Sequence, residues 1–262
     1  MLNIEILSNS ILQVARRAGE AILDVYQSDD FGLETKGDES PLTRADLAAH
    51  EVIASMLRLI TPDTPVVSEE DPASLVYRTP HREFWLIDPL DGTKEFVARN
   101  GEFTVNIALV RGGLAVWGVV YAPVQDSLYW GGAGMGAFVS EKGATRVIEC
   151  ERPAEGQTVK VVASKSHLNE RTQRWIEQLG DVSLIQAGSS LKLCQVASGG
   201  AHVYPRLAPT CEWDTAAAQA VVEGAGGWVT DLQGNQIRYA KAEILNPDFI
   251  ASAISPSKLP KI

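Results

Sequence analysis

The stretch that decides the fold of this chain reads Phe84-Trp85-Leu86-Ile87-Asp88-Pro89-Leu90-Asp91-Gly92-Thr93. Its first four residues are apolar and predict a short buried strand. We expect regular pairing to stop at Pro89, because proline has no N–H to donate to the ladder. Asp91-Gly92 indicates a turn, since glycine adopts backbone angles that other residues avoid. A short helix is then expected over residues 93–98.

The two carboxylates of this stretch, Asp88 and Asp91, predict a site for cations. Two such groups at the end of a strand repel each other, and oxygen-rich sites of this kind suit hard divalent ions. The N–H groups of Gly92 and Thr93, at the start of the expected helix, suit an anion such as phosphate. A metal site beside an anion site indicates metal-assisted phosphate chemistry. An Asp-rich surface turn is the simpler interpretation unless further acidic residues converge here.

Several acidic residues elsewhere in the chain could converge on this turn. Glu69 and Glu70 follow an apolar strand expected over residues 65–68, which could lie beside the central strand. Asp46 lies in the first turn of a predicted helix that ends before Pro62, and Asp214 lies at the start of another. Helix capping or solvation would also explain these acids one by one. Their convergence is what favours a functional site.

The remaining pattern divides the chain near a polar segment at residues 149–157. An amphipathic helix (4–25) and hairpin-like strands precede it, and alternating strands and helices follow it, which predicts an α/β arrangement. We therefore expect residues 1–152 to form an N-terminal α+β subdomain with an antiparallel sheet and most metal ligands. Residues 153–262 are expected to form a C-terminal α/β subdomain that carries Asp214. The expected strands are 103–110, 114–121, 128–130, 136–139, 159–163, 182–186, 201–204 and 228–231, and the expected helices in the second half are 170–179, 190–197 and 214–222.

The composition limits the class of protein. The chain has 262 residues, is 45% hydrophobic and carries a net charge of −10, so it can bury an ordinary core but lacks the basic footprint for nucleic-acid polymers. A small anionic substrate remains compatible, because bound cations reverse the local field. Three widely spaced cysteines without a zinc pattern favour reduced thiols. We expect no signal peptide or membrane span, and hence a cytoplasmic protein, with peripheral attachment to the inner membrane left open.

Three motifs in this order resemble the inositol monophosphatase superfamily: Glu69-Glu70, Asp88-Pro89-Leu90-Asp91-Gly92-Thr93 and Trp213-Asp214-Thr215-Ala216-Ala217. The resemblance spans nearly the whole chain. It implies a layered αβαβα sandwich of the inositol monophosphatase and fructose-1,6-bisphosphatase type, of mixed α/β (α+β) class.

Three further segments narrow the resemblance. They resemble segments of the bacterial 3'(2'),5'-bisphosphate nucleotidases. The segments are Lys94-Glu95-Phe96, Gly101-Glu102-Phe103-Thr104-Val105-Asn106-Ile107-Ala108 and Tyr204-Pro205-Arg206. This implies an enzyme that hydrolyses the 3'-phosphate of 3'-phosphoadenosine 5'-phosphate to AMP and phosphate, in sulfur assimilation and nucleotide recycling. Attack by a metal-activated water and inhibition by lithium are also implied.

The resemblance implies a role for each matching residue. Two Mg²⁺ ions, with a third and weaker one, would be held by Glu69, Asp88, Asp91, Asp214 and the backbone carbonyl of Leu90. The catalytic residues would be Asp46 and Thr93, which orient and deprotonate the attacking water, and Glu70, which supports the third ion or its waters. The substrate contacts would be Glu69, Leu90, Asp91, Gly92, Thr93, His167, Ser189, Lys192, Arg206 and Asp214.

One related activity remains as an alternative at this point, and another is excluded. An inositol monophosphatase or another sugar-phosphate phosphatase would use the same metal site, although Glu95 and the segment around Arg206 argue against it. A haloacid-dehalogenase-type phosphatase does not fit, because its two aspartates are separated by one residue, whereas two residues separate Asp88 from Asp91.

A binding protein without catalytic activity is the alternative from another class. Such a protein could sense the nucleotide or a divalent cation, but it would not need both Asp46 and Thr93. The expected partner is in either case a small phosphorylated nucleotide. No nucleic-acid polymer and no stable protein partner are implied.

Overall fold

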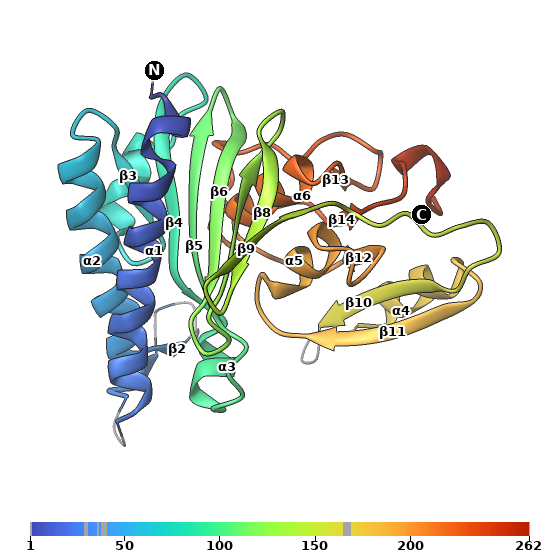
Figure 1. Ribbon diagram of the computed structural model, residues 1–262, viewed down its shortest axis with the longest axis horizontal. Coiled ribbons are helices and arrows are strands. Elements are labelled where there is room, and N and C mark those ends of the chain that lie inside the picture. The colour runs from blue at the N-terminus through green and yellow to red at the C-terminus, as the bar shows by residue number, and fades with distance from the viewer. Residues whose placement is uncertain (1, 29–30, 36, 38–40, 165–168, 262) are drawn as a thin grey trace.

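Five alternating layers of helices and sheets make up the molecule (Figure 1). The computed structural model describes residues 2–28, 31–35, 37, 41–164 and 169–261. The order of layers is helices, sheet, helices, sheet, helix, and the expected αβαβα sandwich of mixed α/β class is therefore confirmed. None of the helices in the described residues is long and apolar enough to cross a bilayer.

The larger sheet has seven strands in the order β3-β4-β5-β6-β7-β8-β9. β3 runs parallel to β4, and every other neighbouring pair is antiparallel, as expected for the first half of the chain. The strands are β3 (Val66–Ser68), β4 (Glu83–Asp91), β5 (Thr104–Arg111), β6 (Leu114–Ala122), β7 (Ser127–Gly132), β8 (Gly136–Glu141) and β9 (Ala144–Ile148).

The smaller sheet has five strands in the order β11-β10-β12-β14-β13. β10 is parallel to both of its neighbours, whereas β14 is antiparallel to β12 and β13. The strands are β10 (Val159–Ser164), β11 (Val182–Ala187), β12 (Val203–Arg206), β13 (Trp228–Asp231) and β14 (Phe249–Ser252). A separate ribbon pairs β1 (Glu34–Thr35) with β2 (Pro41–Leu42).

The helices occupy the three remaining layers (Figure 1). α1 (Ile4–Tyr26) and α2 (Arg44–Ile60) cover one face of the larger sheet, and α5 (Leu191–Ala197) and α6 (Glu212–Gly224) lie between the two sheets. α4 (Glu170–Glu177) covers the outer face of the smaller sheet. The short helices are α3 (Thr93–Val97), η1 (Pro72–Tyr77) and η2 (Pro256–Lys258).

Residues 84–87 of β4 are all apolar because both faces of the strand are buried there. Trp85 and Ile87 belong to the core shared with α1 and α2, whereas Phe84 and Leu86 belong to the core shared with α5 and α6. Successive side chains of a strand point to opposite sides, so a strand between two helical layers needs a continuous apolar run. β4 therefore holds the end that carries Asp88 in a fixed place between two packed layers.

Gly118 in β6 allows α6 to lie directly on the larger sheet. A Cβ atom at this position would lie 2.2 Å from the backbone oxygen of Ala217 in α6. Because both groups belong to regular elements, neither could move aside cheaply. The glycine thus permits the close approach that brings the N-terminal end of α6, with Asp214, to the sheet.

Within the two main sheets, the strand expectations need three corrections. β4 continues through Pro89 to Asp91, and its register with β5 shifts between Asp88 and Asp91, so the proline is accommodated by a bulge and does not end the strand. β9 and β14 were not expected at all. β9 is an edge strand with four exposed residues, and β14 has only four residues, so neither has a clear period-2 signal.

The larger sheet ends at Ile148 and the smaller one begins at Val159. We propose to keep the division into residues 1–152 and 153–262 on this basis. α6 contacts β5, β6 and β7 across that division, so the two parts share a core.

Candidate active site

Three carboxylates from three separate elements meet at one end of the larger sheet. Glu69 follows β3, Asp88 lies in β4, and Asp214 lies in the first turn of α6. One oxygen atom of each lies within 4.8 Å of those of the other two. The parallel register pairs Ser68 with Ile87, which places Glu69 beside Asp88 as the sequence predicted.

The electrostatics of this cluster favour a cation. Burial raises the pKa of the Asp88 carboxyl well above its usual range, and repulsion from Glu69 and Asp91 adds to the shift. Burial likewise raises the pKa of Asp214, with Asp91 and Glu69 adding to it. Oxygen ligands on opposite sides of one Mg²⁺ ion lie about 4.2 Å apart. The donor set and its spacing therefore fit a divalent cation, which would relieve the repulsion.

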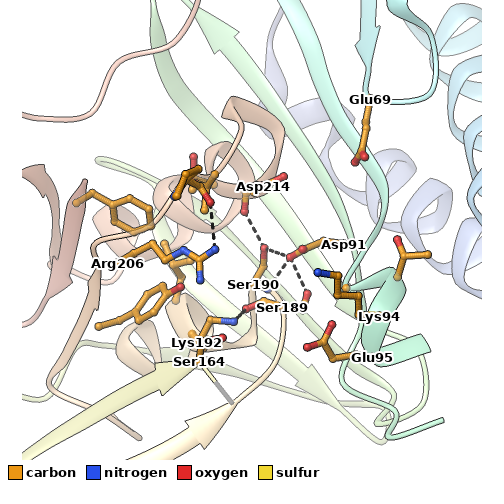
Figure 2. Close-up of a pocket in the computed structure, with 18 of the residues that line it drawn as sticks. Glu69, Asp91, Lys94, Glu95, Ser164, Ser189, Ser190, Lys192, Arg206 and Asp214 are labelled. Atoms are coloured by element: carbon orange, nitrogen blue, oxygen red, sulfur yellow. Dashed lines mark hydrogen bonds between the residues drawn. The ribbon is translucent and has the colours of Figure 1, made fainter. Parts of the chain in front are cut away.

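Asp91 is held by the loop that precedes α5 (Figure 2). Its Oδ2 atom lies 2.7 Å from three donors: the Ser189 hydroxyl, the Ser190 N–H and the Ser190 hydroxyl. The Ser190 hydroxyl also lies 2.9 Å from the backbone oxygen of Asp214 and can donate its proton to one of the two at a time. Asp91 and Asp214 are thus joined through one serine.

A buried polar network supports these two serines from β5. The hydroxyl groups of Thr104 and Ser189 lie 2.7 Å apart, and Asn106 donates to the Ser190 hydroxyl at 2.9 Å. Thr104 also donates to Asn106 at 3.1 Å. Ser189 has φ of 51°, an uncommon conformation for a residue with a side chain, so the hydroxyl is directed at Asp91 by a strained backbone.

Asp46 and Thr93 are brought together as expected. Thr93 Oγ1 lies 3.3 Å from Asp46 Oδ1 and 3.4 Å from the carbonyl oxygen of Leu90. The other oxygen of Asp46 accepts from the N–H and the hydroxyl of Thr43, at 2.8 and 2.6 Å. Thr43 thereby caps α2 and orients the buried Asp46 carboxylate toward Thr93.

A cavity of about 350 Å³ opens beside the carboxylates, and Figure 2 shows residues that line it. Glu69, Asp91 and Asp214 lie at its acidic side, and Lys192 and Arg206 line it as well. Burial lowers the pKa of Lys192 to about 8. Its ammonium group donates to the backbone oxygen of Ser189 and lies 5.6 Å from the centre of the Tyr204 ring.

One N–H donor of Arg206, at Nε, has no hydrogen-bond partner among the described residues. Its Nη2 donates to the Pro209 backbone oxygen at 3.1 Å, whereas its Nε is buried without a hydrogen-bond partner in the described part of the chain. A buried unpaired guanidinium N–H is costly, and an anionic ligand would satisfy it. Lys192 and Arg206, together with Lys94, therefore share a cavity with an acidic cluster, which suits a substrate with more than one anionic group.

The positions of the other site candidates vary. Gly92 has φ of 93° and precedes α3, and both Gly92 and Thr93 line the cavity. Leu90 is buried behind them. Glu70 follows Glu69 in the turn after β3, with its N–H directed to the Ser68 hydroxyl at 3.2 Å. His167 lies outside the described residues.

Several site residues were not identified from the sequence. They are Ser190 and the contacts that Thr43, Thr104 and Asn106 make with site residues. Thr104 and Asn106 stand at alternate positions of a strand whose other residues up to Val110 are apolar. Two polar side chains on one face of such a strand could have indicated a buried polar network. Ser190 gave no comparable signal.

Comparison with known proteins agrees with this geometry. The sequence model of the Inositol monophosphatase family matches residues 5–259. The chain therefore belongs to the inositol monophosphatase family, and it is a phosphatase. The family is metal-dependent, and the acidic cluster described above could bind a metal ion.

The relatives include named nucleotidases. The chain is 46% identical over 246 residues to the 3'(2'),5'-bisphosphate nucleotidase CysQ of Escherichia coli (strain K12), covering 93% of this chain and 98% of that protein. The crystal structure of CysQ from Bacteroides thetaiotaomicron superposes with a TM-score of 0.83 at 40% identity, over 96% of this chain and 99% of that one. A Thermotoga maritima IMPase superposes with a TM-score of 0.75 at 25% identity, over 95% and 92%.

Proposed function

We propose that this chain is a Mg²⁺-dependent, lithium-sensitive 3'(2'),5'-bisphosphate nucleotidase. Its substrate would be 3'-phosphoadenosine 5'-phosphate, and its products AMP and phosphate. The pairing of an acidic cluster with Lys192 and Arg206 in one cavity is the observation that carries the proposal. A substrate with one phosphate needs only the acidic end and its metal ions, whereas a second phosphate needs cations of the protein. The CysQ relatives support the same assignment.

The metal ligands in this proposal are Glu69, Asp88, Asp91, Asp214 and the carbonyl of Leu90, with Glu70 near a third ion. Two or three bound Mg²⁺ ions would neutralise the phosphate dianion and lower the pKa of a water molecule. Hydrogen bonds within the chain hold two of these ligands, Asp91 and Asp214, in place. The hydrogen bonds from Ser189 and Ser190 hold Asp91, and the N–H of Cys211 donates to Asp214 at 2.7 Å.

Asp46 and Thr93 are proposed to carry the proton transfer. Thr93 donates its proton to Asp46 Oδ1, so the lone pairs of Thr93 Oγ1 remain available to accept a hydrogen bond from a water in the cavity. Asp46 can then accept a proton through Thr93, which makes the water a better nucleophile. The N–H groups of Gly92 and Thr93 would bind an oxygen of the phosphate that is removed.

The nucleotide and its second phosphate are proposed to lie toward the smaller sheet. Lys192 and Arg206 would bind the second phosphate, and Ser189 lies between them and Asp91. His167 is retained as a candidate contact. Tyr204 lies beside Lys192 with its ring in the cavity wall and could contact the adenosine.

The test is phosphate release in Mg²⁺ from 3'-phosphoadenosine 5'-phosphate and from inositol 1-phosphate, each with and without lithium. We expect a strong preference for the nucleotide and its loss in lithium. A preference for the inositol ester would leave the metal site intact and refute the nucleotide assignment. Tight nucleotide binding without phosphate release would favour the binding-protein alternative.

A further inference from the structure

Glu212, the first residue of α6, has a carboxylate with 0% exposure that accepts hydrogen bonds on both oxygens. Oε1 accepts from the N–H of Lys241 at 3.2 Å and from its ammonium group at 2.6 Å. Oε2 accepts from the N–H of Ala240 at 2.9 Å and from Arg78 Nη1 at 3.2 Å. The carboxylate is thereby fixed by four donors from two separate segments, although it contacts neither the cavity nor the acidic cluster.

Arg78 lies in the segment between β3 and β4, and its side chain is 10% exposed. Besides Glu212 it donates to the backbone oxygens of Lys241 at 2.7 Å and Ala242 at 3.3 Å. The pair tolerates little change in geometry, because displacement would leave the nearly buried guanidinium of Arg78 without a carboxylate, although Glu212 would keep its contact with Lys241. Arg78 therefore sets where its own segment lies relative to the start of α6.

The two segments joined by this pair are the ones that carry the acidic cluster. Arg78 stands between Glu69 and the strand of Asp88, and Glu212 is two residues before Asp214 on the first turn of α6. In sequence the partners are 134 residues apart, so no local constraint holds them together. The Arg78–Glu212 pair thus links the two segments that carry the proposed metal ligands, and neither residue is among those that line the cavity.

We propose that Arg78 and Glu212 are positioning residues, which set the distance between Asp214 and the Glu69–Asp88 pair and so determine the affinity for Mg²⁺. This inference rests on the proposed function to the extent that the cluster binds Mg²⁺. Groups that orient metal ligands change metal affinity by about 10- to 100-fold when they are removed. A pair that only stabilised the fold would lower the melting temperature and leave the affinity unchanged.

The test measures Mg²⁺ binding by calorimetric titration of the full chain without substrate, together with the melting temperature in EDTA. Arg78→Met and Glu212→Gln are expected to weaken Mg²⁺ binding by about 10-fold or more. Arg111→Met is the matched control. Arg111 also pairs with one carboxylate, that of Glu83, and with one backbone oxygen, that of Leu2, but at the far end of β4 from Asp91.

We expect the control to lose stability and to keep the Mg²⁺ affinity of the unmodified chain within about twofold. Arg78→Lys retains the charge without the fork of donors, and its affinity is expected to lie between those of Arg78→Met and the unmodified chain. If Arg78→Met does not fold, the Mg²⁺ affinity of Arg78→Lys tests the inference in its place. Unchanged Mg²⁺ affinity in folded Arg78 and Glu212 variants, or an equal loss in Arg111→Met, would overturn the inference.

The same measurements separate this inference from the proposed function. If the unmodified chain binds Mg²⁺ but releases no phosphate from the nucleotide, the proposed function fails and the positioning role is still decided by the titrations. If the chain hydrolyses the nucleotide and the Arg78 and Glu212 variants bind Mg²⁺ normally, only the positioning role fails.

Discussion

Ser190 donates to Asp91 from both its backbone N–H and its hydroxyl, each at 2.7 Å. Asp91 ends a strand of the larger sheet, and Ser190 begins the helix that carries Lys192. The proposed metal site and the proposed nucleotide site are therefore in direct contact through these two residues. A displacement of Ser190 would therefore change the hydrogen bonds that hold Asp91.

Removing the Ser190 hydroxyl is expected to weaken metal binding. In Ser190→Ala the carboxylate of Asp91 keeps the N–H donor but loses a charged hydrogen bond, and Asn106 loses its acceptor. We expect Mg²⁺ affinity to fall by about 10-fold in a calorimetric titration. Ser198→Ala is the control, since its hydroxyl donates to the Cys194 carbonyl at the other end of α5. Equal affinity in both variants would refute the role of Ser190.

The hydroxyl of Thr93 is expected to be needed for turnover. Thr93→Val keeps the shape of the side chain but cannot pass a proton to Asp46, so kcat at saturating Mg²⁺ should fall by roughly 10²-fold or more. Thr93→Ser keeps the hydroxyl and is expected to retain most of the activity. The measurement is the initial rate of phosphate release. Similar rates for the two variants would show that Thr93 takes no part in proton transfer.

The acidic cluster predicts that the metal-free protein loses stability as the pH rises. Burial raises the pKa of Asp88 above its usual 3.8, so the folded state holds this proton more firmly than the unfolded state. The stabilisation by that proton is complete below pH 3.8 and is lost as the pH rises through the pKa of the folded state. At pH 8 in EDTA, Asp88→Asn should therefore raise the melting temperature by at least about 2 °C, with a smaller gain at pH 5.

Added Mg²⁺ should raise the melting temperature of the unmodified chain far more than that of Asp88→Asn. Asp126→Asn is the control for removing a carboxylate charge that is already compensated, because Asp126 accepts a hydrogen bond from Arg16 at 2.7 Å. That variant should gain no stability at pH 8. A less stable Asp88→Asn in EDTA would contradict the assignment of unrelieved repulsion at the cluster.

The buried Lys192 predicts a pH limit on nucleotide binding. Burial lowers the pKa of its ammonium group to about 8, so the positive charge is lost as the pH rises through that value. We expect KM for 3'-phosphoadenosine 5'-phosphate to rise between pH 7 and 9.5. In Lys192→Arg the charge persists, and KM should change less over the same range. Parallel KM profiles for the two proteins would exclude Lys192 as the residue that titrates.

The sequence predicted the acidic residues of the candidate site better than the residues that hold them by hydrogen bonds. Glu69, Asp88 and Asp214 could be identified because each follows an apolar run or opens a helix, and the pairing of Asp46 with Thr93 followed from the family resemblance. These signals are local or carried by the motif itself.

The contacts around Asp91 could not be predicted in the same way. The Ser189 and Ser190 hydroxyl groups reach Asp91 only because the residues before α5 lie against β5. These serines are 98 and 99 residues from Asp91 along the chain, a relationship that no local pattern reports. Arg78 and Glu212 were missed for the same reason, since an isolated arginine in a loop and an acid at a helix start are ordinary surface features. The bulge at Pro89 has no sequence signal of its own, because a proline predicts the end of a strand, whereas packing on both faces continues β4 to Asp91.

The position of Asp214 has a consequence for synthesis of the chain. Glu69, Asp88 and Asp91 leave the ribosome long before α6 does, and only α6 brings the last carboxylate of the cluster. Until that helix has docked against Gly118, a nascent chain can offer only a partial and weak site for cations. Tight metal capture would therefore be postponed until the sandwich is nearly complete, and an incompletely folded chain would be unable to hydrolyse phosphate esters.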